Sequence, residues 1–144
     1  MRLDRDELAR LIPHQGRMCL LDGVIEYDTT TIVCATTSHR RLDNPLRRRG
    51  RLGALCGLEY AAQAVAVHGG LSAAAAQTRA KPGLLAGTRE IRLAVERLDD
   101  IGSDLIVRAE QLIAGGDALL YAFALSADEK ILLEGRLSIF FAPS

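Results

Sequence analysis

The spacing of apolar residues changes along the chain and predicts three regions. Two short runs rich in apolar and β-branched residues, Cys19–Tyr27 and Thr31–Thr37, flank a polar turn and predict an antiparallel hairpin. From about residue 54 to residue 67 the chain is apolar on nearly every face of a helix, which predicts a helix buried inside the protein. After Gly83 apolar and polar residues alternate with a period of two, which predicts half-buried strands.

Capping residues and glycines predict where the helices begin and end. Asp4 can cap a short helix that runs through Ile12, with Glu7 in the position of a capping box. We expect Gly69–Gly70 to stop the long helix. The alanine-rich segment Leu71–Arg79 is expected to form a further helical piece.

The order of these elements predicts the fold. Two strands before an apolar helix and four after it can cover that helix only if it lies against the concave face of a strongly curved antiparallel sheet. This α+β order is similar to that of the hotdog fold. A chain of 144 residues is long enough for one such domain, spanning residues 1–144, and too short for two.

Glu59 is the one ionisable residue in the apolar run Leu52–Val67. A buried charge costs free energy unless it is paired, and a buried carboxyl usually stays protonated. A carboxylic acid held in that state is what general acid or base catalysis requires. Glu59 is therefore the first candidate for chemistry. The plainer alternative is a structural ion pair with an arginine of a partner subunit.

Composition excludes several classes of function. Acidic and basic residues balance at 18 each, so no overall field favours nucleic acid or anionic lipid. The apolar run is too short and too polar to span a bilayer, and Met1–Arg10 does not resemble a secretory signal, so we expect a cytoplasmic protein. No nucleotide, metal or serine-hydrolase motif is present, and no cofactor is implied. The cysteines are expected to be small core residues: Cys19, Cys34 and Cys56.

Three blocks of the sequence resemble the β-hydroxyacyl-acyl carrier protein dehydratases, a family with the hotdog fold. They are Ile12–Asp22, which contains a Pro-His pair, Gly57–Gln63, in which a Glu precedes a Gln by four residues, and Leu85–Arg92. The family's second His-Phe-Pro and its Pro-Gly-Val segment are replaced here by Asn44–Ala54. This variation resembles the dehydratases of aryl-polyene gene clusters.

The resemblance implies that His14 and Glu59 are the catalytic pair and that they meet across a homodimer interface, one from each subunit. Dehydration of a 3-hydroxyacyl thioester to the trans-2-enoyl thioester takes a proton from the carbon beside the carbonyl and adds one to the departing hydroxyl. We expect a neutral His14 to accept the first proton and a protonated Glu59 to supply the second.

The same chemistry predicts supporting groups. Gln63 lies one helical turn beyond Glu59 and is expected to orient its carboxylate by hydrogen bonding. The charge that develops on the thioester oxygen needs hydrogen-bond donors. Free backbone amides at the start of the long helix are expected to supply them: Gly53, Ala54 and Gly57.

Six arginines lie within residues 40–51 against a single acid, Asp43, in a segment predicted to be a loop. Such charge runs are usually solvated. Arginine also suits the carboxylates and the pantetheine phosphate of an acyl carrier protein, and the loop directly precedes the helix with Glu59. The residues expected to dock the carrier protein are Arg47, Arg48, Arg49 and Arg51.

The other two histidines are not expected to take part in catalysis. His39 is adjacent to Arg40 and is predicted to be a solvated loop residue. His68 is predicted to lie at the end of the long helix, about half a rotation from Glu59, where the two cannot pair within one chain.

Two alternatives stay open for function. A thioesterase of the same fold would use a carboxylate to activate water, but it would not need the block that contains His14. A non-catalytic subunit would lend its surface to an active partner in a dehydratase heterodimer. The presence of both His14 and Glu59 disfavours that second alternative.

Overall fold

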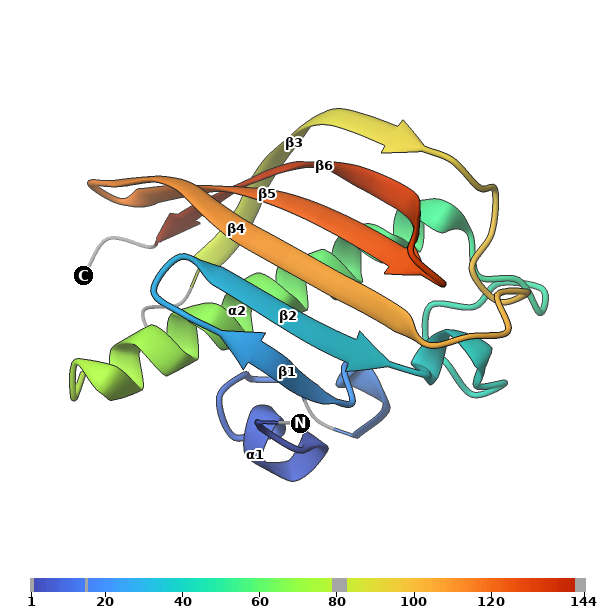
Figure 1. The fold of residues 1–144 in the computed structure, drawn as a ribbon, viewed down its shortest axis with the longest axis horizontal. Coiled ribbons are helices and arrows are strands. Elements are labelled where there is room, and N and C mark those ends of the chain that lie inside the picture. The colour runs from blue at the N-terminus through green and yellow to red at the C-terminus, as the bar shows by residue number, and fades with distance from the viewer. Residues whose placement is uncertain (1, 15, 79–82, 142–144) are drawn as a thin grey trace.

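The computed structural model describes residues 2–14, 16–78 and 83–141, and these form one antiparallel sheet of six strands packed on a long helix. The strand order across the sheet is β1-β2-β4-β5-β6-β3. Figure 1 shows helix α2 lying behind the curved sheet, with α1 beside β1. This confirms the predicted architecture. The elements are α1 (Arg5–Ala9), β1 (Gly23–Tyr27), β2 (Thr31–Thr36), α2 (Gly57–Ala75), β3 (Gly83–Leu93), β4 (Leu105–Gly115), β5 (Ala118–Ala127) and β6 (Lys130–Phe141).

The predicted β1–β2 hairpin is confirmed, with a tight turn that one side chain organises. Oδ1 of Asp28 accepts hydrogen bonds from the backbone N–H groups of Thr30, at 2.9 Å, and Thr31, at 2.7 Å. The hydrogen bond from the Thr30 amide, and to a smaller extent that from the Thr31 amide, holds the pKa of Asp28 below its ordinary value. Residues 19–22, predicted as part of the first strand, precede it instead.

The predicted capping box begins α1. Asp4 Oδ1 accepts from the N–H of Glu7 at 2.9 Å, and Glu7 Oε1 accepts from the N–H of Asp4 at 3.2 Å. The helix ends at Ala9, earlier than the predicted end at Ile12. Ile12 is nevertheless buried, so the residues after α1 are held by packing and not by helical hydrogen bonds.

Helix α2 continues through Gly69–Gly70 to Ala75, so the prediction that these glycines end it is wrong. A buried helix gains most of its stability from packing, which outweighs the cost of glycine in a helix interior. Gly70 also permits a close approach: a Cβ there would lie 2.9 Å from the backbone oxygen of Leu11. The chain after α1 therefore packs directly on α2.

The core lies between α2 and the concave face of the sheet. In β6, Leu133, Leu137 and Ile139 are buried against the helix, as the alternation of apolar and polar residues predicts. Gly57 lets the first turn of α2 approach this layer, because a Cβ there would come within 2.8 Å of the side chain of Leu133. Cys19 and Cys34 are buried as predicted, and burial raises the pKa of Cys34 to about 12.

Strand β3 forms one edge of the sheet. It pairs with β6, the last strand, and not with β4, its successor in the chain. Two of its apolar side chains, Leu85 and Leu93, are 42% and 48% exposed, because α2 does not extend across this edge. β3 is therefore an apolar edge with unpaired backbone groups along one side.

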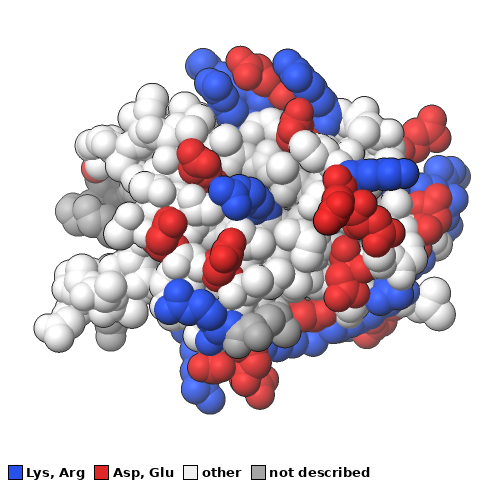
Figure 2. Space-filling model, viewed as in Figure 1, with Lys and Arg blue, Asp and Glu red and all other residues white. Residues whose placement is uncertain are grey.

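The outer face of the sheet carries interspersed charge. Figure 2 shows acidic and basic side chains mixed over this face, with an uncharged area at the left, over the end where β4 turns into β5. No single-sign field covers it, as the balanced composition predicts. Within the described residues, no helix is long and apolar enough to cross a membrane.

Candidate active site

Glu59 lies in the first turn of α2 and is exposed in the single protomer, which does not supply the apolar wall that the sequence predicts. Leu55, four residues earlier and so on the same side, is 57% exposed. Ala62 and Ala66 follow on the same side of α2 and are half-buried. Glu59 is thus a carboxylate in the middle of an apolar helix face that the protomer's own sheet leaves uncovered.

His14 lies in the loop between α1 and the 3-10 turn Gly16–Met18, and it is half-buried. Its Nδ1 atom is buried and has no hydrogen-bond partner among the described residues. Among these residues no hydrogen bond or ion pair joins His14 to Glu59. A buried imidazole nitrogen without a partner is costly, and a catalytic role is one explanation for such a group.

Gln63 does not orient Glu59, contrary to the prediction. Its Nε2 donates to the backbone oxygen of Met18 at 2.6 Å, and its Oε1 accepts from the N–H of Leu20 at 2.9 Å. The side chain is 2% exposed, so both ends of the carboxamide are committed to the segment that follows His14.

Two of the three backbone amides predicted to bind the thioester oxygen are engaged elsewhere. The N–H of Ala54 donates to the backbone oxygen of Glu96 at 3.0 Å, and that of Gly57 to the oxygens of Ala54 and Leu55. The N–H of Gly53 donates to no oxygen among the described residues and faces the thiol of Cys56. Of the three amides, it is therefore the one at the entrance to α2 that no described carbonyl group occupies.

The arginine-rich loop ends in a two-residue turn. Arg48 and Arg51 exchange backbone hydrogen bonds, and the two residues between them, Arg49 and Gly50, have positive φ angles of 53° and 75°. A left-handed conformation is unfavourable for an arginine. This turn exposes Arg48, Arg49 and Arg51, which form no ion pair with any described residue.

Arg47 does not belong to this exposed set, because it is half-buried and its guanidinium group bonds within the loop. Its Nη1 donates to the backbone oxygen of Gly50 at 2.8 Å and its Nη2 to that of His39 at 3.3 Å. Its Nε is buried and has no partner among the described residues. Arg47 thus stabilises the loop through hydrogen bonds to its backbone.

His39 is fully buried, which contradicts the prediction of a solvated residue. Its Nε2 lies 3.0 Å from the backbone oxygens of both Ile101 and Ser103, so this nitrogen carries the hydrogen. Burial lowers the pKa of His39, which favours the neutral ring.

His68 is also buried, within α2 and not at its end as predicted. Its Nε2 donates to the backbone oxygen of Asp28 at 2.9 Å, and its Nδ1 accepts from the hydroxyl of Tyr121 at 2.6 Å. Burial raises the pKa of Tyr121 to about 12, so the phenol keeps its hydrogen. His39 and His68 are therefore both part of the buried interior.

A buried polar cluster beside Glu59 has no counterpart in the sequence analysis. The hydroxyl of Tyr60 lies 2.8 Å from that of Ser38 and accepts from Nδ2 of Asn44 at 3.0 Å. Asn44 Oδ1 in turn accepts from the N–H of Leu46. These bonds tie the arginine-rich loop to the helix next to Glu59.

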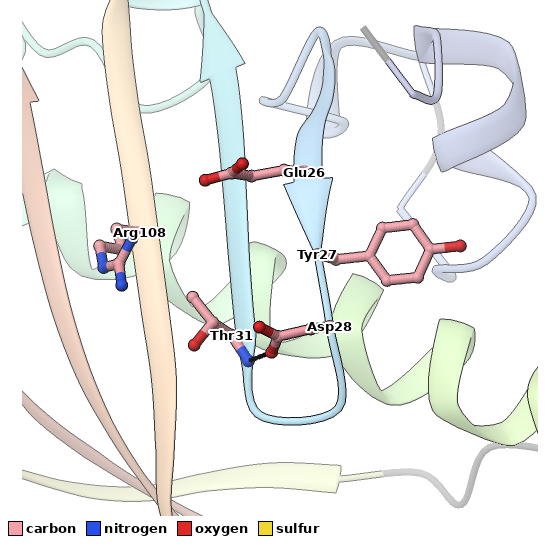
Figure 3. A pocket seen from close by; sticks show the side chains of 5 residues that line it. All are labelled: Glu26, Tyr27, Asp28, Thr31 and Arg108. Atoms are coloured by element: carbon pink, nitrogen blue, oxygen red, sulfur yellow. Dashed lines mark hydrogen bonds between the residues drawn. The ribbon is translucent and has the colours of Figure 1, made fainter.

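A hollow of about 160 Å³ lies on the outer side of the β1–β2 hairpin. Figure 3 shows its lining, in which Glu26, Asp28 and Arg108 supply charge and the Asp28–Thr31 hydrogen bond lies at one end. Its charged lining does not suit an acyl chain. Neither His14 nor Glu59 lines it.

The fold is shared with solved structures of the hotdog class. The chain is similar to a chain of the dehydratase heterocomplex ApeI:P from Xenorhabdus doucetiae, with a TM-score of 0.85 and 25% identity over 95% of this chain and 91% of that one. Zebrafish thioesterase superfamily member 2 is similar at a TM-score of 0.63 and 16% identity, covering 96% and 95% of the two chains. A hypothetical thioesterase with coenzyme A from Streptococcus pneumoniae is similar at 0.58 and 11%, covering 84% and 85%.

A family model places the chain more narrowly within this class. The model of the ApeP-like family, described as ApeP dehydratase, matches residues 6–144. The chain belongs to the ApeP-like dehydratase family. No curated protein sequence is significantly similar to it.

Proposed function

We propose that this protein dehydrates a 3-hydroxyacyl thioester carried on an acyl carrier protein to the trans-2-enoyl thioester, in aryl-polyene or fatty-acid-like biosynthesis. Membership of a dehydratase family supports the reaction class. The observation that carries the proposal is Glu59, an exposed carboxylate on an apolar face of α2. His14, whose Nδ1 has no partner in the described part of the chain, supplies the second titratable group that the reaction needs.

The exposed apolar surface around Glu59 supports a site that a second subunit completes. Leu55 in the 3-10 turn Ala54–Cys56 just before α2, and Leu85 and Leu93 on β3, are exposed apolar side chains that an oligomer could cover. The partner is a second copy or a related hotdog subunit, and the similar ApeI:P structure is a heterocomplex. Burial by that partner would give Glu59 the apolar surroundings that favour its protonated form.

In the proposed reaction His14 takes the proton from the carbon beside the thioester carbonyl. Glu59 of the partner protomer gives its proton to the departing hydroxyl, which leaves as water as the new double bond forms. The negative charge passes through the thioester oxygen, and the N–H of Gly53, which meets no carbonyl oxygen of the described residues, is the amide that can donate to it. The arriving carrier protein would be held by Arg48, Arg49 and Arg51, exposed at the entrance to α2.

The alternatives predict different products. A thioesterase would hydrolyse the same substrate to a free acid and a free carrier thiol. The similar thioesterase structures share only 11% and 16% sequence identity with this chain, so they support the fold and not the reaction. A non-catalytic subunit would form no enoyl product alone. It would raise the activity of an added hotdog partner even when its own His14 is replaced.

The decisive experiment incubates the purified protein with a 3-hydroxyacyl carrier protein and follows the loss of one water by mass spectrometry. We expect His14→Ala and Glu59→Gln each to abolish the enoyl product while retaining the wild-type fold. Glu26→Gln, an exposed carboxylate of β1 on the outer face, is the matched control and should be fully active. Full activity of either site variant, or release of free acid by the wild type, would contradict the proposal.

A further inference from the structure

The segment Gly16–Leu20, which follows His14, lies outside the sheet and is held by side chains. Gln63 bonds to the backbone of Met18 and Leu20, on both sides of Cys19. Nη2 of Arg5 in α1 donates to the backbone oxygens of Gly16, at 2.8 Å, and Cys19, at 3.0 Å. The oxygen of Leu20 accepts from the hydroxyls of Thr36 and Ser38. An irregular loop is thus fixed from α1, α2, β2 and the 3-10 turn Ser38–Arg40.

The same loop touches α2 a second time, on the other side of His14. Leu11 packs on Gly70, where a Cβ would lie 2.9 Å from the Leu11 oxygen and 3.0 Å from its Cβ. Gly70 and Gln63 are seven residues apart, or about 10 Å along the helix axis. His14 therefore lies between two anchor points on the helix that also carries Glu59.

Among the described residues, none accepts from or donates to Nδ1 of His14 to fix its ring. Its position must follow from the backbone on either side. We propose that Gln63 is a positioning residue whose carboxamide fixes the loop carrying His14 on α2 and so sets where the imidazole meets the substrate. A carboxamide offers the donor for Met18 and the acceptor for Leu20 in one buried side chain that does not titrate. This inference rests on the proposed dehydratase function.

Loss of this anchor should affect chemistry more than binding. A catalytic group misplaced by about 1 Å can cost roughly 100-fold in rate. For Gln63→Leu we expect kcat to fall by about 10- to 100-fold, with KM within about twofold of wild type. Gln63→Glu keeps the acceptor and should be intermediate, and its activity should fall further as rising pH ionises the introduced carboxyl beside the Met18 oxygen.

Imidazole NMR signals test the inference without catalysis. The chain has only three histidines, so ring signals of His14 can be followed beside those of His39 and His68. In Gln63→Leu we expect the ring signals of His14 to move while those of the two buried histidines stay. Tyr121→Phe is the matched control, because it removes a buried hydrogen bond to His68 and should move only that ring.

A second variant covers the case in which Gln63→Leu fails to fold. Arg5→Met removes the anchor from α1 and should also move the His14 signals and lower kcat. An active wild type whose His14 signals and kcat do not change in Gln63→Leu or Arg5→Met would overturn this inference alone. If the wild type is inactive but the His14 signals still move in the variants, the proposed function is wrong. The inference that Gln63 positions the loop carrying His14 would then still hold.

Discussion

Asp99 accepts a hydrogen bond from the backbone N–H of Leu52 at 2.9 Å, and so joins the segment after β3 to the chain that leads into α2. Arg97 forms an ion pair with the same carboxylate and, by its hydrogen bonding, holds the pKa of Asp99 well below its usual range. Leu98 and Leu52 are bonded through their backbones. Asp99 thereby fixes the entrance to α2, next to the amide of Gly53.

Replacement of Asp99 by Asn should loosen this entrance. The ion pair with Arg97 is lost, and we expect the free energy of unfolding to fall by about 2 kcal/mol at neutral pH. A depressed carboxyl pKa contributes stability above its unfolded value of about 4, and that contribution is lost as the pH falls through the folded value. The gap between wild type and Asp99→Asn should therefore narrow below pH 4 in urea unfolding. A gap independent of pH would contradict this role.

The two adjacent glycines of α2 should respond in opposite directions to alanine. A Cβ at Gly69 would meet nothing within 4 Å, so Gly69→Ala should stabilise the helix by roughly 0.5–1 kcal/mol. A Cβ at Gly70 would collide with the backbone of Leu11, so Gly70→Ala should destabilise by about 1–3 kcal/mol. Thermal unfolding of the two variants measures this difference. Equal shifts would mean that the chain after α1 does not pack on Gly70.

His39 should make the protein less stable in mild acid. Burial lowers the pKa of the folded His39, whereas the unfolded chain takes up the proton near pH 6.5. Stability is therefore fully present above about pH 6.5 and is lost as the pH falls through the lower folded pKa. His39→Gln keeps a donor for the Ile101 and Ser103 oxygens without titrating. Thermal unfolding between about pH 7.5 and 5 should show a flatter profile for this variant than for wild type.

Arg47 and Arg49 should have separable roles. Arg49→Gly removes an exposed charge and relieves a left-handed residue, so we expect a higher KM for the carrier-protein substrate and up to about 1 kcal/mol more stability. Arg47→Met removes bonds to Gly50 and His39, so it should lower stability with KM unchanged. Added salt should raise the KM of wild type more than that of Arg49→Gly. The same KM for Arg49→Gly and wild type would remove the docking assignment.

Subunit mixing tests whether His14 and Glu59 act across an interface. If each site takes one residue from each protomer, a mixed dimer of His14→Ala and Glu59→Gln contains one intact site. Random exchange of the two inactive variants should then restore roughly a quarter of wild-type activity. No recovery after verified subunit exchange would place both residues in one protomer's site.

Local sequence pattern predicted the elements because secondary structure depends on residues a few positions apart. The alternation in β6 assigned Leu133 and Leu137 to the core, since the two faces of a half-buried strand differ in exposure. The capping box at Asp4 and Glu7 is likewise local. The prediction that Gly69–Gly70 would end α2 was wrong because packing against Leu11 outweighs helix propensity there.

Predicted contacts were less successful. Helical spacing suggested Glu59 as the partner of Gln63, but the actual partner Leu20 is 43 residues away in the chain. His39 is buried by carbonyl groups more than 60 residues later. No sequence pattern around Gln63 or His39 predicts these partners.

The sequence by itself determined the strand and helix types, the buried character of α2 and the presence of His14 and Glu59. Only the tertiary structure decided that β3 pairs with β6, that the Gly53 N–H meets no carbonyl oxygen of the described residues, that Arg47 bonds within its loop and that Glu59 lies on an uncovered face. The reason is physical. Periodicity records which side of an element is apolar, whereas pairing, burial and hydrogen-bond partners depend on which distant segments the folded chain brings together.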